Sequence, residues 1–142
     1  MRLEALQTEP AMFRTSTPAE ATLTDADWKE RVQHPRAVFV LLENNIPIGM
    51  TSILLVDDDV AYLGQSYIKK EFRGKGLAAL LYKARMAWAH NLQLKKLTIS
   101  HRQSNLISKA ANQRLGFIYI HSETMNWLDG TVEDVLYYEL EL

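Results

Sequence analysis

The chain has 142 residues, which suits a single domain over 1–142, and 47% of them are hydrophobic, enough to build a core. A formal net charge of -1 gives no basic field for nucleic acid or an anionic membrane, and no apolar run approaches the roughly 20 residues of a membrane span. The absence of cysteine excludes disulfides and a cysteine nucleophile, and it is compatible with the cytoplasmic location that we expect. The four histidines are scattered without ligand spacing, so we expect no metal site.

The N-terminal part of the chain favours short helices. Residues 1–7 support a strand or a helix equally well, and Thr8 is placed to cap a short helix after them. A stronger helix follows, with Thr24 or Asp25 as its cap. It is predicted to end at Pro35, because the residue before a proline avoids helical backbone.

Strands dominate the rest of the chain. Residues that favour β structure predict them at 37–42, 48–56, 60–68, 94–100, 117–123 and 135–140. Two helices interrupt this series, one over 74–90 and one over 105–115 that Ser104 can cap and Gly116 closes. Asp129-Gly130 signals a hairpin before the last strand. The elements predict an α+β fold, with a mixed, mostly antiparallel sheet of six or seven strands flanked by three or four helices on both faces.

The loop between strand 60–68 and helix 74–90 is the most informative stretch. It reads Arg73-Gly74-Lys75-Gly76-Leu77-Ala78. A helix N-terminus collects unpaired backbone N–H groups and the positive end of the helix dipole, and glycines let an anion approach them closely. The order of strand, glycine loop and helix therefore predicts a phosphate-binding site.

The loop matches neither the Walker A sequence nor the Rossmann fingerprint, but it does match R-x-x-G-x-A. Together with residues 67–72, which lead into it, the loop resembles the pyrophosphate-binding motif of the GNAT superfamily, the acyl-CoA-dependent N-acyltransferases. Asn105, Ser108 and Leu115-Gly116-Phe117 fall where that family has a second helix and its end, so the resemblance covers nearly the whole chain. It implies the GNAT fold and an acyltransferase with acetyl-CoA as co-substrate.

The resemblance also implies a coenzyme A site in three parts. The pyrophosphate would lie on the N–H groups of the glycine loop, the pantetheine arm would follow the end of strand 60–68, and the second helix would contact the arm from the other side. The cofactor-binding residues so implied are Ser66, Tyr67, Ile68, Arg73, Gly74, Lys75, Gly76, Leu77, Ala78, Asn105, Ser108 and Asn112.

The catalytic groups are where this sequence departs from the family. The backbone N–H of Ile68 is implied to polarise the thioester carbonyl. Many members carry a tyrosine acid where this chain has Asn112, and an amide cannot donate a proton as an acid. The position that often holds a carboxylate base is Tyr62, and a phenol is a poor base at neutral pH, although it could orient a water. His101 is the other candidate, because histidine changes charge near neutral pH.

The leading interpretation is an N-acetyltransferase that moves an acetyl group from acetyl-CoA to a primary amine by direct attack in a ternary complex. The acceptor could be a small amine, an antibiotic, an amino acid, or a protein N-terminus or lysine, because segments 8–35 and 121–134, which would form its site, carry no deciding pattern. A second interpretation is a catalytically weak or inactive acyl-CoA-binding module with the same fold, serving as a sensor or regulatory subunit, and a third is a nucleotide-phosphate binder. Members of the superfamily often form dimers, so a homodimer is also considered.

Overall fold

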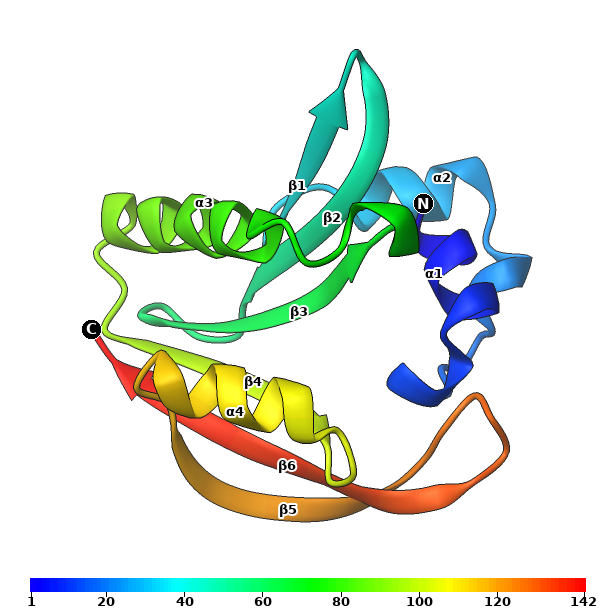
Figure 1. The fold of residues 1–142 in the computed structure, drawn as a ribbon. Coiled ribbons are helices and arrows are strands. Elements are labelled where there is room, and N and C mark those ends of the chain that lie inside the picture. The colour runs from blue at the N-terminus through cyan, green and yellow to red at the C-terminus, as the bar shows by residue number, and fades with distance from the viewer.

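The structure is a computed structural model that describes all residues of the chain, 1–142. One six-stranded sheet runs through it in the order β1-β2-β3-β4-β6-β5, and every neighbouring pair is antiparallel except β3 and β4 (Figure 1). The helices are α1 (Arg2–Thr8), α2 (Asp25–Glu30), α3 (Leu77–Asn91) and α4 (Leu106–Arg114), and the strands are β1 (Arg36–Glu43), β2 (Ile46–Leu55), β3 (Val60–Ile68), β4 (Lys96–Arg102), β5 (Ile118–Asn126) and β6 (Val132–Glu141). The predicted α+β fold is confirmed, with six strands.

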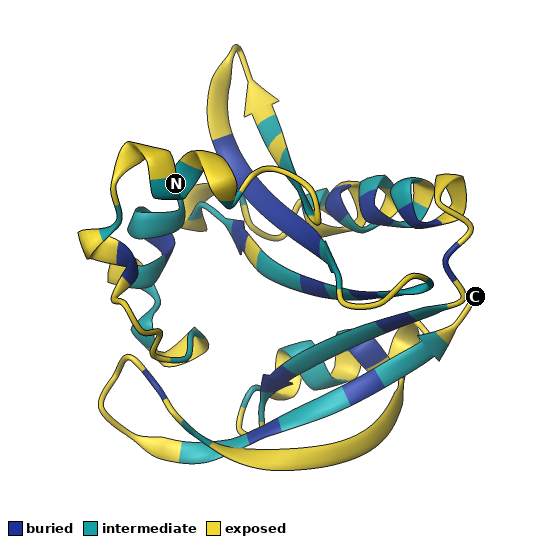
Figure 2. Cartoon of the chain, turned by 180° about the vertical axis from the view of Figure 1, so that it is seen from behind, coloured by how far each residue is buried: buried dark blue, intermediate teal, exposed yellow.

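Helices cover both faces of the sheet, as predicted. α3 packs on one face, over a core in which Ile53, Leu63 and Leu97 are fully buried. α1 packs on the other face, where Ala5 joins Met50 in a second, smaller cluster. In Figure 2 the buried residues concentrate in β2 and the centre of the sheet, whereas β5 is exposed along almost its whole length. None of the helices is long and apolar enough to cross a membrane.

The N-terminal elements differ in detail from those predicted. Residues 1–7 resolve as helix, since α1 occupies most of them. Thr8 is not a cap, because its hydroxyl donates to the carbonyl of Glu4 inside α1, and 3-10 turns at Pro10–Met12 and Glu20–Thr22 replace the predicted helix after it. Thr24 does cap α2, in a reciprocal capping box with Asp27. The same helix ends at Glu30, earlier than predicted, and non-helical turns carry the chain on to β1.

Two predicted helix starts are also corrected. The helix predicted over 74–90 begins at Leu77, because Gly74 and Gly76 have φ values of +77° and +75°, which a right-handed helix excludes. The cap of α4 is Asn105 and not Ser104, because the Asn105 side chain accepts a hydrogen bond from a backbone N–H in the first turn of the helix.

The feature that positions the site is the parting of β3 from β4. The two strands pair only from Val60 to Leu63 on β3, opposite 96–99 on β4. Next to this ladder Gln65 has a φ of +55°, and the register between β2 and β3 shifts between Met50 and Ser52. A residue in the left-handed region and a register shift mark a bulge, which bends a strand locally. β3 therefore stays paired with β2 up to Ile68 while it leaves β4.

Candidate functional site

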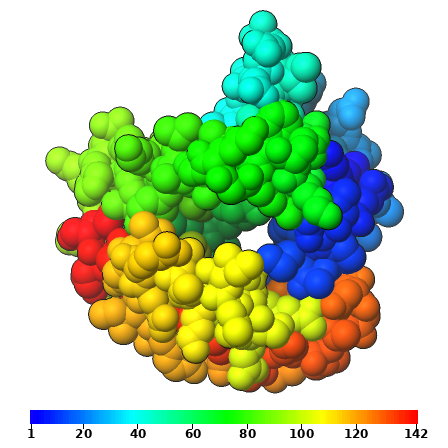
Figure 3. Space-filling view, viewed as in Figure 1, coloured from blue at the N-terminus to red at the C-terminus, as the bar shows by residue number.

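A cavity of about 780 Å³ opens where β3 leaves β4. Its wall includes residues from β3 and β4, from α3 and α4, and from the segment between α1 and β1. Figure 3 shows the molecule hollowed at this place, between α3 in green, α4 in yellow and the N-terminal segment in blue. The cavity therefore reaches both faces of the sheet through the gap between the two strands.

The N-terminus of α3 is open to an anion. No side chain caps it, and Gly76 stands at the cap position in the left-handed region. A Cβ added at Gly74 or at Gly76 would meet no atom within 4 Å. The first N–H groups of the helix, at Leu77 and Ala78, therefore face open space. Lys75 lies beside them in the sequence, with its Nζ 5.4 Å from the centroid of the Phe72 ring.

Arg73, by contrast, is already engaged inside the chain. Its Nε donates to the carbonyl of Ile68 over 2.8 Å, and its Nη1 forms an ion pair with Glu9 at 2.9 Å. The guanidinium also lies 5.7 Å from the centroid of the Tyr67 ring. These contacts tie the glycine loop to the end of β3 and to the segment after α1, so Arg73 fixes the position of the loop.

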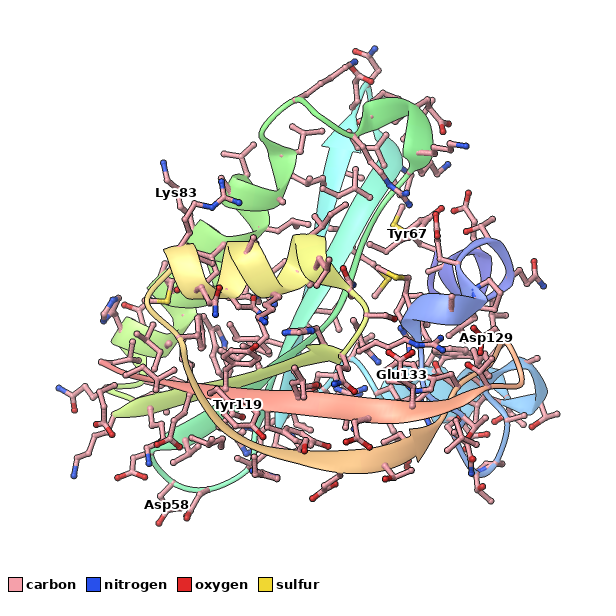
Figure 4. All side chains as sticks on the ribbon, turned by 60° about the horizontal axis from the view of Figure 1, so that its bottom comes forward. Asp58, Tyr67, Lys83, Tyr119, Asp129 and Glu133 are labelled. Atoms are coloured by element: carbon pink, nitrogen blue, oxygen red, sulfur yellow. The ribbon has the colours of Figure 1, made fainter.

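The free edge of β3 presents backbone groups to the opening. The N–H of Lys69 donates to Ile48 in β2, so the N–H of the preceding residue, Ile68, points the opposite way, toward the gap. Ser66 lines the cavity, and its hydroxyl lies 2.7 Å from that of Thr51. The side chain of Tyr67 instead packs toward α1, so only its backbone could serve a ligand in the cavity (Figure 4).

α4 forms the wall opposite β3. Asn105 caps the helix by accepting from the N–H of Ser108 at 3.1 Å, and both residues line the cavity. Asn112 lines it as well and is 5% exposed. Three positions that the sequence singled out for cofactor binding are thereby brought together on one side of the gap.

Arg85 is a residue that the sequence analysis missed. It lies on the inner face of α3, is 6% exposed and lines the cavity. Its Nη1 donates to Ser66 Oγ over a long 3.4 Å, its Nε has no partner, and no carboxylate of the chain pairs with it. Burial lowers the pKa of Arg85 to about 10, which still leaves it charged at neutral pH. Leu81, Arg85 and Ala89 are spaced four apart on the buried face, but apolar residues elsewhere on the helix leave that face undetermined in the sequence.

A tyrosine pair occupies the other face of the sheet. The hydroxyls of Tyr62 on β3 and Ser100 on β4 lie 2.6 Å apart. Arg14 donates to Tyr62 over 3.2 Å and to the hydroxyl of Tyr137 on β6 over 2.7 Å. Burial raises the pKa of Tyr137, although the charge of Arg14 opposes the shift. Arg14, in the segment between α1 and β1, thus connects β3 in one half of the sheet with β6 in the other.

His101 lies on the opposite face from this pair. Alternation along β4 puts it on the face that carries Leu97, whereas Ser100 faces the tyrosines. Its Nδ1 lies 2.7 Å from the carbonyl of Arg102 and its Nε2 lies 3.0 Å from the hydroxyl of Tyr138. A neutral ring that donates from Nδ1 to the carbonyl accepts at Nε2 from the phenol, so both nitrogens are already used.

The structure gathers a large part of the predicted site. The residues predicted from the sequence that line the cavity are Tyr62, Ser66, Ala78, His101, Asn105, Ser108 and Asn112. The glycine loop from Arg73 to Leu77 lies outside the lining, in the connection that leads into α3.

Comparisons with known proteins agree on the family. The model of the acetyltransferase (GNAT) family matches residues 2–117. The acetyltransferase of GNAT family from Streptococcus pneumoniae has a similar structure, with a TM-score of 0.76 at 18% identity over 99% of this chain and 90% of that one. A GNAT family acetyltransferase from Elizabethkingia anophelis, with acetyl-CoA bound, gives a TM-score of 0.67 at 20% identity over 92% and 95%.

A structure described as a probable acetyltransferase shares 26% identity, with a TM-score of 0.70 over 82% of this chain and 68% of the other. No curated protein sequence matches the chain. The family model covers far more than half of the 142 residues, and it agrees with the fold and with the resemblance of the glycine loop. The chain therefore belongs to the acetyltransferase (GNAT) family and is an acyltransferase with the fold of that family.

Proposed function

We propose that this protein transfers an acetyl group from acetyl-CoA to a primary amine by direct attack in a ternary complex. The observation that carries the proposal is the uncapped N-terminus of α3, with two glycines in the left-handed region, next to a cavity that reaches both faces of the sheet. The Elizabethkingia structure supports the choice of acyl donor, because its fold is similar and it holds acetyl-CoA.

The donor would enter from the side of α3 and α4. Its pyrophosphate fits the N–H groups of Leu77 and Ala78, which carry the positive end of the helix dipole. Its pantetheine arm would run between the free edge of β3 and α4, with the backbone of 66–68 on one side and Asn105, Ser108 and Asn112 on the other. This path leads the thioester to the gap between β3 and β4.

The acceptor would come from the opposite face, past Tyr62. In the transfer the amine nitrogen forms a bond to the acetyl carbon, the carbon–sulfur bond breaks, the nitrogen gives up one proton and the sulfur leaves as a thiolate. The N–H of Ile68, which points into the gap, is placed to stabilise negative charge on the carbonyl oxygen.

The positive charge of Arg85 would compensate for the missing acid by stabilising the leaving thiolate. Asn112 cannot protonate the leaving sulfur, but the charged guanidinium of Arg85 lies beside Ser66, at the inner end of the proposed donor path. A buried positive charge stabilises a thiolate without giving up a proton, and a thiol pKa of about 8.5 lets solvent complete the step near neutral pH.

The proton on the amine needs its own acceptor. Tyr62 is positioned to orient a water through its hydroxyl, which already joins Ser100. His101 can act as a base only if Tyr138 releases its Nε2. A pH–rate profile separates the two, because His101→Ala changes its shape only if the imidazole accepts the proton during turnover.

Two measurements test the proposal as a whole. Calorimetry with coenzyme A should detect binding, and release of free thiol from acetyl-CoA should depend on an added amine. Binding without any amine-dependent release would favour the acyl-CoA sensor. Absence of binding would remove the acetyl-CoA assignment altogether.

A further inference from the structure

The N-terminal side of the cavity is built largely from arginine. Arg2 from α1, Arg14 from the segment after it, Arg31 after α2 and Arg36 at the start of β1 all line the cavity, and we call these four residues the arginine wall. Glu20 is the one carboxylate in the whole lining. The cavity therefore carries a large excess of positive charge in a chain whose formal net charge is -1.

Glu20 compensates only part of this charge. Nε and Nη2 of Arg2 each donate to it over 2.9 Å, and Nη1 of Arg31 lies 3.6 Å away. Burial alone would raise the pKa of Glu20, but the hydrogen bond and charge of Arg2, with the charges of Arg31 and Arg36, hold it below its ordinary value. One ionised carboxylate among three arginines leaves two positive charges without a partner.

Several donors of the arginine wall are unsatisfied. Nη1 of Arg2 and Nε of Arg36 are buried and have no hydrogen-bond partner in the chain. Arg14 donates to the hydroxyls of Tyr62 and Tyr137 and forms no ion pair. Leaving a buried charged donor without an acceptor costs free energy that a bound anion would recover.

The arginine wall lies on the acceptor side of the sheet. Arg36 stands opposite Leu54, and Leu54 stands opposite Tyr62, in the registers of β1 with β2 and of β2 with β3. Residues directly opposite each other share a face, so Arg36 and Tyr62 point to the same side. The pyrophosphate site at α3 lies on the other side, so the arginine wall is not needed to hold the donor.

Another arginine of the lining, Arg102, has its charge compensated by two carboxylates, although its Nε makes no hydrogen bond. Arg102 pairs with Asp129 at 2.8 Å and with Glu133 at 3.2 Å, two carboxylates that lie beside the N-terminal helices (Figure 4). These contacts raise the pKa of Arg102, and the hydrogen bond that Arg102 donates to Asp129 contributes most. No such pair of carboxylates serves the arginine wall.

We propose that the acceptor of this enzyme is a small amine that carries its own anionic group, a carboxylate or a phosphate, and that the arginine wall binds this group. The inference rests on the proposed acetyl transfer. Guanidinium groups match the two oxygens of a carboxylate or phosphate through parallel N–H donors. The same field disfavours polyamines and aminoglycosides, whose positive charges would be placed among arginines.

A matched set of short amines tests the proposal. β-Alanine carries a carboxylate, phosphoethanolamine a phosphate, ethanolamine no second charge and spermidine further positive charges. The kcat/KM for acetyl transfer should be about ten-fold or more higher for the better anionic amine than for ethanolamine, as one charged hydrogen-bonded contact provides. The anionic amine with the higher kcat/KM identifies whether a carboxylate or a phosphate is bound. Equal or higher values for ethanolamine or spermidine would overturn the inference.

A binding measurement keeps the two proposals apart. With coenzyme A present, an anionic amine should raise the melting temperature further and spermidine should not, because a ligand of the folded state stabilises it. No shift with either anionic amine overturns the inference while coenzyme A binding still supports the donor site. Failure of coenzyme A to bind overturns the proposed function itself.

A substitution locates the effect. Arg14→Gln should raise KM for the anionic amine about ten-fold more than KM for ethanolamine, because it removes the charge and keeps a hydrogen-bond donor, whereas its contact with Tyr62 bears on both amines alike. Arg114→Gln, on the exposed end of α4, removes the same charge outside the cavity and is the matched control. If Arg14→Gln does not fold, Arg31→Gln serves in its place. Equal effects of the wall and control variants on KM would contradict the assignment.

Discussion

The anion site at α3 can be tested with a pair of glycine substitutions. Gly76 and Gly130 have φ values of +75° and +84°, and a Cβ at either position would meet nothing within 4 Å. Placing an alanine in the left-handed region costs about 1–2 kcal/mol. For a chain of this length each kcal/mol lowers the melting temperature by about 3–4 °C. Gly76→Ala and Gly130→Ala should therefore lose similar stability, since neither creates a clash.

Their effects on coenzyme A should differ. At Gly76 the new methyl group projects into the space before the N–H groups of α3, whereas Gly130 lies in the turn between β5 and β6. Loss of one charge-assisted hydrogen bond costs about 1.5–3 kcal/mol, which weakens the dissociation constant about 10- to 100-fold. Calorimetry on the two variants, at a temperature where both are folded, measures this difference. The same dissociation constant for both would refute the idea that these N–H groups hold the pyrophosphate.

Other substitutions probe the remaining parts of the site. Arg85→Met should leave the melting temperature unchanged or raise it, because an apolar side chain replaces a buried unpaired charge. The same substitution should lower kcat about ten-fold or more. A loss of stability that parallels the loss of activity would mark Arg85 as structural. Glu20→Gln should cost about 2 kcal/mol in urea unfolding, because the guanidinium of Arg2 loses its carboxylate. Because the pKa of Glu20 is lowered in the folded state, its contribution to the free energy of unfolding is complete above pH about 4.3. The contribution disappears as the pH falls through the pKa of the folded state. Acid unfolding of the wild type and of the variant measures this difference. Leu63→Ala, at a core position that is 1% exposed, should cost about 3 kcal/mol without altering the pH–rate profile.

The proposed donor half of the site could be inferred from the sequence because its chemistry is local. Strand 60–68 is observed with the predicted bounds, and the glycine loop and the helix after it stand in the predicted order. A glycine loop at a helix start specifies its function through backbone N–H groups that adjoin one another in the chain. The predicted start of the helix at Gly74 was wrong, because Gly74 and Gly76 have positive φ values. These values depend on how the loop joins the strand to the helix, and the residue pattern of the loop does not reveal them.

The inner face of α3 was misjudged for a related reason. Leu80 of this helix is 51% exposed although it is apolar, and the buried positions are Leu81, Arg85 and Ala89. A helix with apolar residues around much of its circumference does not reveal which side meets the sheet. An arginine on such a helix looks like a solvated side chain in the sequence, and only its packing against the neighbouring strands shows that it is 6% exposed.

The arginine wall was further out of reach, since its members come from α1, α2, β1 and the segments between them. The formal net charge of -1 argued correctly against a basic field over the whole chain, but it averages over regions that differ in sign. The cavity lining holds six arginines and one glutamate out of 16 basic and 17 acidic residues, which leaves ten basic and 16 acidic side chains elsewhere. A surface of net negative charge around a positive cavity repels anions everywhere except at the opening and concentrates its field there. The near-zero total that gave no basic field for nucleic acid or an anionic membrane therefore conceals a division of charge that would suit the proposed donor and the proposed anionic acceptor on opposite faces of one sheet.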